Sequence, residues 1–103
     1  MSRDAHVIPS AAGSITIQAD ALAGLVVAAA ERVDGARVRR PRRGLDVSVE
    51  GGGVHVALEL AARYGIVLPE LARAVQAGVT TALREGTGLD VRAVDVSVEE
   101  LDP

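Results

Sequence analysis

Residue types that do chemistry are few in this chain, and their spacing does not suggest a catalytic or metal-binding site. The 103 residues contain no cysteine, which excludes disulfides, thiolate metal sites and a cysteine nucleophile. The two histidines are His6 and His55, and Glu59 is the carboxylate that would share a strand face with His55. Neither a third metal ligand nor a group that would orient an acid–base pair accompanies them. We therefore expect a protein that is not an enzyme and uses no metal or cofactor.

The strongest charge feature is a basic stretch over residues 37–43. All eleven basic residues of the chain are arginines, and five of them lie in this stretch. The six arginines outside it are set against fourteen acidic residues, and the net charge of the whole chain is −3. The chain is therefore expected to combine one basic tip with an acidic body. Its candidate partner-binding residues are Arg37, Arg39, Arg40, Arg42 and Arg43.

Four partners would suit this basic loop. They are anionic lipid head groups, at roughly 1 kcal/mol per basic residue, an acidic partner protein, the acidic face of a second copy, and nucleic-acid phosphate. The competing interpretation is a solvated hairpin loop that only aids solubility. Single-strand recognition usually adds aromatic stacking, but the only aromatic residue is Tyr64. A small RNA- or DNA-binding protein is accordingly the alternative function.

Hydrophobic periodicity predicts the elements that must position these residues. Residues 1–12 carry little pattern and a proline, so we expect a flexible N-terminal arm. Alternation of apolar and polar residues predicts strands on both sides of the glycine turn 51–53, and i, i+3, i+4 spacing predicts two helices. The predicted elements are strand 15–17, helix 20–32, strands 45–50 and 54–61 with Val38 a further strand residue, a helix beginning at Pro69 and ending by Gly88, and strand 91–98.

These elements predict an α+β fold in one domain over residues 13–101. Each helix has one apolar face and the strands alternate, so two helices packed on one face of a mostly antiparallel, three- to four-stranded sheet would bury every apolar stripe. We expect Tyr64 to cap the core with its hydroxyl in water. Gln76, which flanks the apolar stripe of the second helix, is expected to hydrogen-bond a neighbouring backbone group.

The order of several short motifs resembles the alkaline shock protein family over roughly residues 13–101. Two departures are Ala36, where the family more often has valine, and the short arginine-rich linker that follows it. The stretches that carry the resemblance are GSITIQADALAGLVVAAAERVDGA, VHVALELAARYGIVLPELARAVQAGV and TALREGTGLDVRAVDVSVEEL, which contain Val33-Asp34-Gly35-Ala36, Tyr64-Gly65, Val75-Gln76 and Thr87-Gly88-Leu89-Asp90-Val91.

The resemblance implies a non-catalytic bacterial scaffold or adaptor in cell-envelope homeostasis and stress response. It also implies contact with a membrane-embedded partner protein and self-association, so we expect a homo-oligomer and no small-molecule substrate. The chain's start lacks the apolar core of a signal peptide, and its longest apolar run, 25–30, is far shorter than the roughly 20 residues that span a bilayer. We therefore expect a cytoplasmic protein, peripheral at the inner face of the membrane through its partner.

Overall fold

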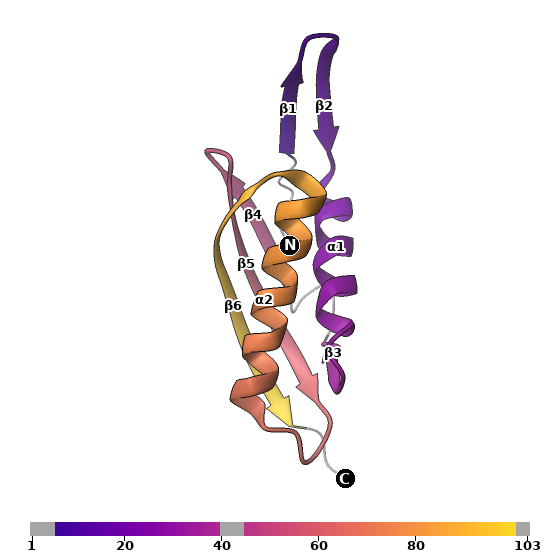
Figure 1. Ribbon diagram of the computed structural model, residues 1–103, viewed down its shortest axis with the longest axis vertical. Helices are drawn as coiled ribbons and strands as arrows, with labels where there is room; N and C mark the ends of the chain where they lie inside the picture. The colour runs from indigo at the N-terminus through magenta and orange to yellow at the C-terminus, as the bar shows by residue number, and fades with distance from the viewer. Residues whose placement is uncertain (1–5, 40–44, 101–103) are drawn as a thin grey trace.

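The computed structural model describes residues 6–39 and 45–100, which form a two-stranded hairpin and an α+β body (Figure 1). The molecule is elongated, with principal extents of 53 × 22 × 18 Å. Its elements are β1 (His6–Ser10), β2 (Gly13–Ile17), α1 (Ala19–Glu31), β3 (Ala36–Val38), β4 (Leu45–Glu50), β5 (Gly53–Ala62), α2 (Leu68–Thr87) and β6 (Asp90–Glu100).

β5 is the central strand of the body's sheet. β4 and β3 pair antiparallel with successive parts of it, so that Leu45 lies opposite Leu58 and Val38 opposite Leu60. β6 pairs with β5 in parallel, the geometry expected for two strands joined by a helix. Along β5, the residues that pair with β3 and those that pair with β4 are separated by Glu59 alone. In the sequence, residues 39–44 separate β3 from β4.

Both helices pack on the same face of this sheet, and Figure 1 shows them side by side in front of it. Pro69 stands in the first turn of α2, where a missing N–H costs nothing. Gly88 ends α2 with φ +74°, a left-handed conformation that glycine adopts without strain. The core between the layers consists of small aliphatic side chains, and its largest fully buried residues are Leu22, Val26, Val54, Val56, Leu60, Val75, Val79, Leu83 and Leu89.

The predicted fold class is confirmed: two helices lie on one face of a mostly antiparallel sheet. The predicted helices and strands agree with α1, β4, β5, α2 and β6 to within a few residues. The parallel pairing of β6 is a detail that the sequence does not reveal. Among the described residues, no helix has the length and apolar character needed to cross a membrane.

The N-terminal hairpin was not predicted. Residues 6–10, which we expected to belong to the flexible arm, form β1 and pair with β2 through a two-residue turn at Ala11 and Ala12. Figure 1 shows the hairpin projecting beyond the helices at one end of the molecule. The domain boundary at residue 13 and the flexibility of the arm stay predictions.

Candidate functional site

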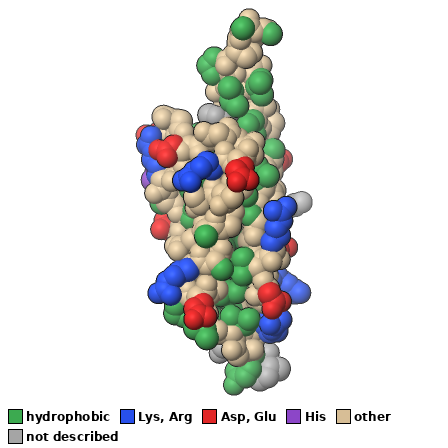
Figure 2. All heavy atoms as spheres, in the orientation of Figure 1, with side chains coloured by type: hydrophobic (Ala, Val, Ile, Leu, Met, Phe, Trp, Pro, Cys, Tyr) green, Lys and Arg blue, Asp and Glu red, His purple; other side chains and the backbone are tan. Residues whose placement is uncertain are grey.

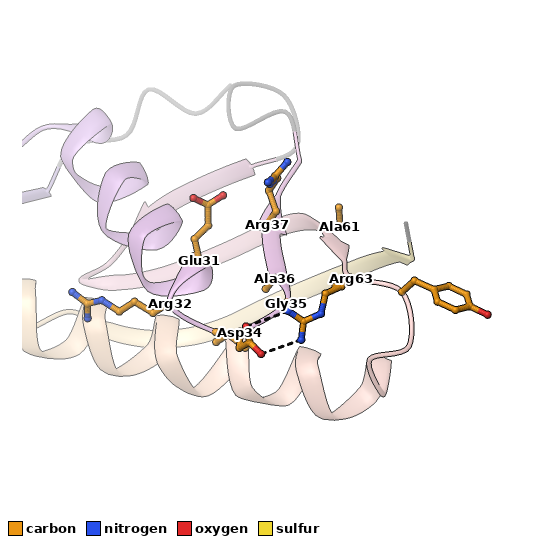
Figure 3. Close-up of a pocket in the computed structure, with 10 residues that line it drawn as sticks. Glu31, Arg32, Asp34, Gly35, Ala36, Arg37, Ala61 and Arg63 are labelled. Carbon is orange, nitrogen blue, oxygen red and sulfur yellow. Dashed lines mark hydrogen bonds and ion pairs between the residues drawn. The ribbon is translucent and has the colours of Figure 1, made fainter. Parts of the chain in front are cut away.

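A cleft of about 640 Å³ lies where the end of α1, β3 and the end of β5 meet (Figure 3). It lies at the opposite end of the body from the hairpin (Figure 1). Charged side chains of both signs line it together with backbone and small residues. The lining residues are Glu31, Arg32, Val33, Asp34, Gly35, Ala36, Arg37, Ala61, Arg63 and Tyr64.

Both carboxylates of the cleft are already engaged. Asp34 forms an ion pair with Arg63, with 3.1 Å between Nη2 and Oδ2 (Figure 3). Glu31 accepts a hydrogen bond from the backbone N–H of Val38 at 3.0 Å, so a helix side chain covers a polar group of β3. The Asp34–Arg63 pair is largely exposed, at 86% and 61% of the side chains, and contributes little to stability.

Arg32 and Arg37 are the cleft's available cations. Neither guanidinium has a bonded partner within the part of the chain that the structure describes, and both residues are exposed. Arg32 is the C-cap residue that follows α1, whereas Arg37 lies on β3 (Figure 3). A guanidinium binds carboxylates and phosphates through two parallel N–H donors. The cleft can therefore accept an anionic group from a partner.

The arginines of the predicted basic loop do not share one environment in the structure. Arg37 lies within β3 and lines the cleft, so the basic stretch begins inside a strand. Arg39 forms an ion pair with Glu99 of β6 and donates its backbone N–H to the carbonyl of Glu59. β3 and β4 pair with successive parts of β5 and not with each other, so these two strands do not form the hairpin of the competing interpretation. The remaining predicted residues, Arg40, Arg42 and Arg43, lie outside the described residues.

The sheet face away from the helices is open and acidic. Cross-strand register sets Asp46 and Asp95 on either side of Ala57, and Glu59 beside Ser97. These three carboxylates have no bonded partner among residues 6–39 and 45–100. A hollow of about 260 Å³ lies among them. A negative, aromatic-free surface does not suit nucleic acid, which binds to positive grooves with stacking side chains.

Other residues singled out in the sequence have clear positions. Gln76 donates from Nε2 to the carbonyl of Val94 at 3.0 Å, which confirms the expected backbone hydrogen bond. Tyr64 does not cap the core as expected: it is 58% exposed and is one of the residues that line the cleft. His55 is exposed on the open sheet face beside Ser48 and Ala93. In the described portion, no three His, Cys, Asp or Glu side chains group closely enough to hold a metal ion.

Sequence reasoning missed Arg32, Asp34 and Arg63 as neighbours of Arg37. The alternation of apolar and polar residues predicts that Asp46 and Asp95 face solvent. Their position on either side of Ala57 depends on the register of β4 and β6 against β5, which the sequence does not give. For Arg63 and Asp34 the sequence contains no such signal, because they follow different elements and are brought together only when the end of β5 folds beside β3.

Comparison with known proteins gives a family and a fold. The model of the alkaline shock protein 23 family, described as having a cell envelope-related function, matches residues 6–103. No curated protein matches the chain. Among solved structures, the zinc form of a MamM CTD variant is 25% identical, covers 82% of this chain and 87% of its own, and has a TM-score of 0.64. The nickel form is 25% identical, with coverages of 81% and 99% and a TM-score of 0.65.

Proposed function

This chain belongs to the alkaline shock protein 23 family, whose function is related to the cell envelope, and from that premise we propose that it is a non-catalytic scaffold or adaptor. In this role it serves envelope homeostasis and stress response by binding other proteins. The proposed place of action is the cytoplasm, at the inner face of the membrane, where a membrane-embedded partner protein holds it. Self-association belongs to the same proposal.

The observation that carries this proposal is the pair of available arginines in the cleft. Arg32 and Arg37 are exposed and have no bonded partner among the described residues, and Tyr64 stands exposed at the rim. Arginine and tyrosine are enriched in protein–protein interfaces and dominate their binding energy. A surface that combines them in a concavity is well suited to a partner segment.

An acidic segment of the partner protein fits the cleft better than a lipid surface does. The cleft is concave, and the carboxylates of Glu31 and Asp34 are part of its lining. A flat anionic bilayer would meet these carboxylates together with the arginines, whereas an acidic segment that enters the concavity can place its own carboxylates beside individual guanidiniums. We therefore propose an acidic segment of a membrane-embedded protein as the occupant.

The non-catalytic part of the proposal rests on the environment of the titratable groups. Catalytic acids and bases usually lie in partly desolvated sites that shift their pKa. Within the described residues, no polar or charged side chain is buried. The charged groups of the cleft are instead exposed or paired at its surface, an arrangement that favours recognition of a partner.

The proposal is tested by affinity capture of the tagged protein from detergent-solubilised cells treated with nuclease. The test variant carries Arg32→Gln and Arg37→Gln. The control carries Arg73→Gln and Arg84→Gln, which remove the same charge from α2 without touching the cleft. We expect wild type and control to recover one membrane protein, and the cleft variant to lose most of it.

Three results would contradict the proposal. Recovery of nucleic acid and no membrane protein by the wild type would favour the nucleic-acid alternative. Equal recovery of the membrane protein by all three forms would remove the cleft from the contact. Binding of the wild type to protein-free anionic vesicles, lost in the cleft variant, would replace the partner protein by the lipid surface.

A further inference from the structure

The hairpin of β1 and β2 stands almost free of the body. Its strands pair with each other, and Ile17 at its base is the hairpin residue that packs against the core. Val7 and Ile15 are 54% and 53% exposed. A lone two-stranded hairpin is at best marginally stable in water, whereas three or more strands with an apolar face are stable. The hairpin therefore gains most if another strand pairs with it.

The two outer edges of the hairpin differ. Pro9 has no N–H, and it lies opposite Ser14, so this pair is one that exchanges no hydrogen bonds across the hairpin. Pairs that exchange hydrogen bonds alternate along the hairpin with pairs that do not. The backbone N–H and C=O groups of Ser14 and Thr16 therefore point away from β1. In the same way, the backbone groups of Val7 and Pro9 point away from β2. The outer edge of β1 thus lacks a donor at Pro9, while that of β2 keeps its donors and acceptors.

The free edge of β2 is complementary to itself. When two copies of β2 lie antiparallel about a two-fold axis at Ile15, Ser14 of one copy faces Thr16 of the other. These pairs exchange about four main-chain hydrogen bonds. The two Ile15 side chains then lie directly opposite each other on one face. The hairpin projects beyond the helices (Figure 1), so this arrangement places the two bodies at opposite ends of the joined hairpins.

The pairing also completes an apolar surface. Ile8 lies opposite Ile15 within the hairpin, so the joined sheet carries a continuous row of four isoleucines across four strands. Cross-strand contacts between β-branched residues each stabilise a sheet by roughly 0.2–1 kcal/mol. Four strands with such a face pass the size at which a sheet becomes independently stable.

The hairpin's charge singles out a second copy as the occupant. Residues 7–19 contain no charged residue, although charged residues make up 24% of the chain. Figure 2 shows this contrast, with blue and red side chains confined to the body. In a two-fold contact, a residue near the axis lies close to the same residue of the second copy, so a charged residue there would face an equal charge and be repelled. Insertion into lipid is disfavoured, since an open strand edge leaves backbone groups unpaired in hydrocarbon.

We propose that the outer edge of β2, Gly13–Ile17, is a self-association surface that joins two copies of this chain into a four-stranded sheet. The inference deepens the self-association in the proposed function but does not involve the cleft, so the two fail separately. Five residues per copy bury far less than the roughly 1,200 Å² of a stable complex. We therefore expect a weak dimer that forms at high local concentration.

Disulfide cross-linking tests the contact directly, because the native chain has no cysteine. Ile15→Cys places two thiols at Cα positions roughly 4.5 Å apart across the axis, within the range that a disulfide spans. Val7→Cys is the matched control: it is equally exposed but lies on the other edge, roughly 16 Å from its copy. We expect mild oxidation to link Ile15→Cys into dimers at least tenfold faster than Val7→Cys.

Charge substitution provides an independent readout by sedimentation equilibrium of the full chain. Ile15→Glu should raise the dimer dissociation constant about tenfold or more, and a mixture with Ile15→Lys should restore association. Val7→Glu should leave the constant unchanged. Equal cross-linking of both cysteine variants, or an Ile15→Glu variant that associates like wild type, would overturn the inference. So would a wild-type chain that stays monomeric up to about 1 mM.

Discussion

Gln76 and Glu31 connect the helices to backbone groups of the sheet. Gln76 of α2 donates to the carbonyl of Val94, and Glu31 of α1 accepts the N–H of Val38, each at 3.0 Å. Of these, the Gln76 contact was predictable, because its position beside the apolar stripe of α2 points an amide toward the sheet. The Glu31 contact was not, because nothing in the sequence aligns the end of α1 with β3.

Removing the Gln76 amide should destabilise the fold modestly. Gln76→Ala leaves the Val94 carbonyl without this donor, which should lower the free energy of unfolding by about 1 kcal/mol. Thr81→Ala, an exposed position on the same helix, should change it by less than about 0.5 kcal/mol. Urea denaturation measures both, and equal stability of the two variants would show that the hydrogen bond is unimportant.

Two glycine-to-alanine substitutions should have opposite signs. Gly35 has φ +88°, and an added Cβ would overlap the Ile66 side chain, so Gly35→Ala should destabilise by at least about 1 kcal/mol. Gly24 lies inside α1 with open space around it, so Gly24→Ala should stabilise by about 0.5–1 kcal/mol. Thermal unfolding of both variants would contradict this account if the midpoints shifted in the same direction.

At the scale of elements, periodicity predicted the helices and the alternating strands because each has one buried face. Val94, Val96 and Val98 face the helices as alternation required, although the parallel pairing of β6 with β5 comes from tertiary packing. β1 was missed because a proline and small residues weaken its pattern, and it pairs only within an exposed hairpin. Elements without a buried face leave little signal in sequence.

The central strand β5 should be the most sensitive element. Leu60 is completely buried between Val38 of β3 and Val98 of β6, so Leu60→Ala should lower the free energy of unfolding by about 2–5 kcal/mol. Val67→Ala, at a residue that is 57% exposed, should cost less than about 1 kcal/mol. A loss below about 1 kcal/mol for Leu60→Ala in guanidinium denaturation would contradict the packing described.

At the scale of the whole molecule, the surfaces lie apart: the cleft at one end, the uncharged hairpin at the other, and the acidic sheet face between them. The sequence predicted a basic stretch over residues 37–43 and an acidic body, because charge counts are visible without a structure. It did not predict that Arg32 and Arg37 would line the same cleft, or that Arg39 would form an ion pair with Glu99. Such contacts depend on how strands align.

Added salt should separate the two proposed contacts. Partner capture through Arg32 and Arg37 is a contact between charges, so recovery of the membrane protein should fall strongly between about 50 and 500 mM salt. The hairpin contact contains no charged residue, so oxidation of Ile15→Cys to a dimer should keep its rate over the same range. A salt-insensitive capture would contradict the role of the arginines, and a salt-sensitive cross-link would contradict that of the hairpin.

The most direct test of partner binding at the cleft is photo-cross-linking in living cells. A benzophenone amino acid replaces Tyr64, which is exposed at the cleft rim, or Thr81, which is exposed on α2, as a control. We expect position 64 to form an adduct with one integral membrane protein, which disappears when Arg32→Gln and Arg37→Gln are added, and position 81 to form none. An adduct from position 81 but not from position 64, or none with any membrane protein, would contradict the account.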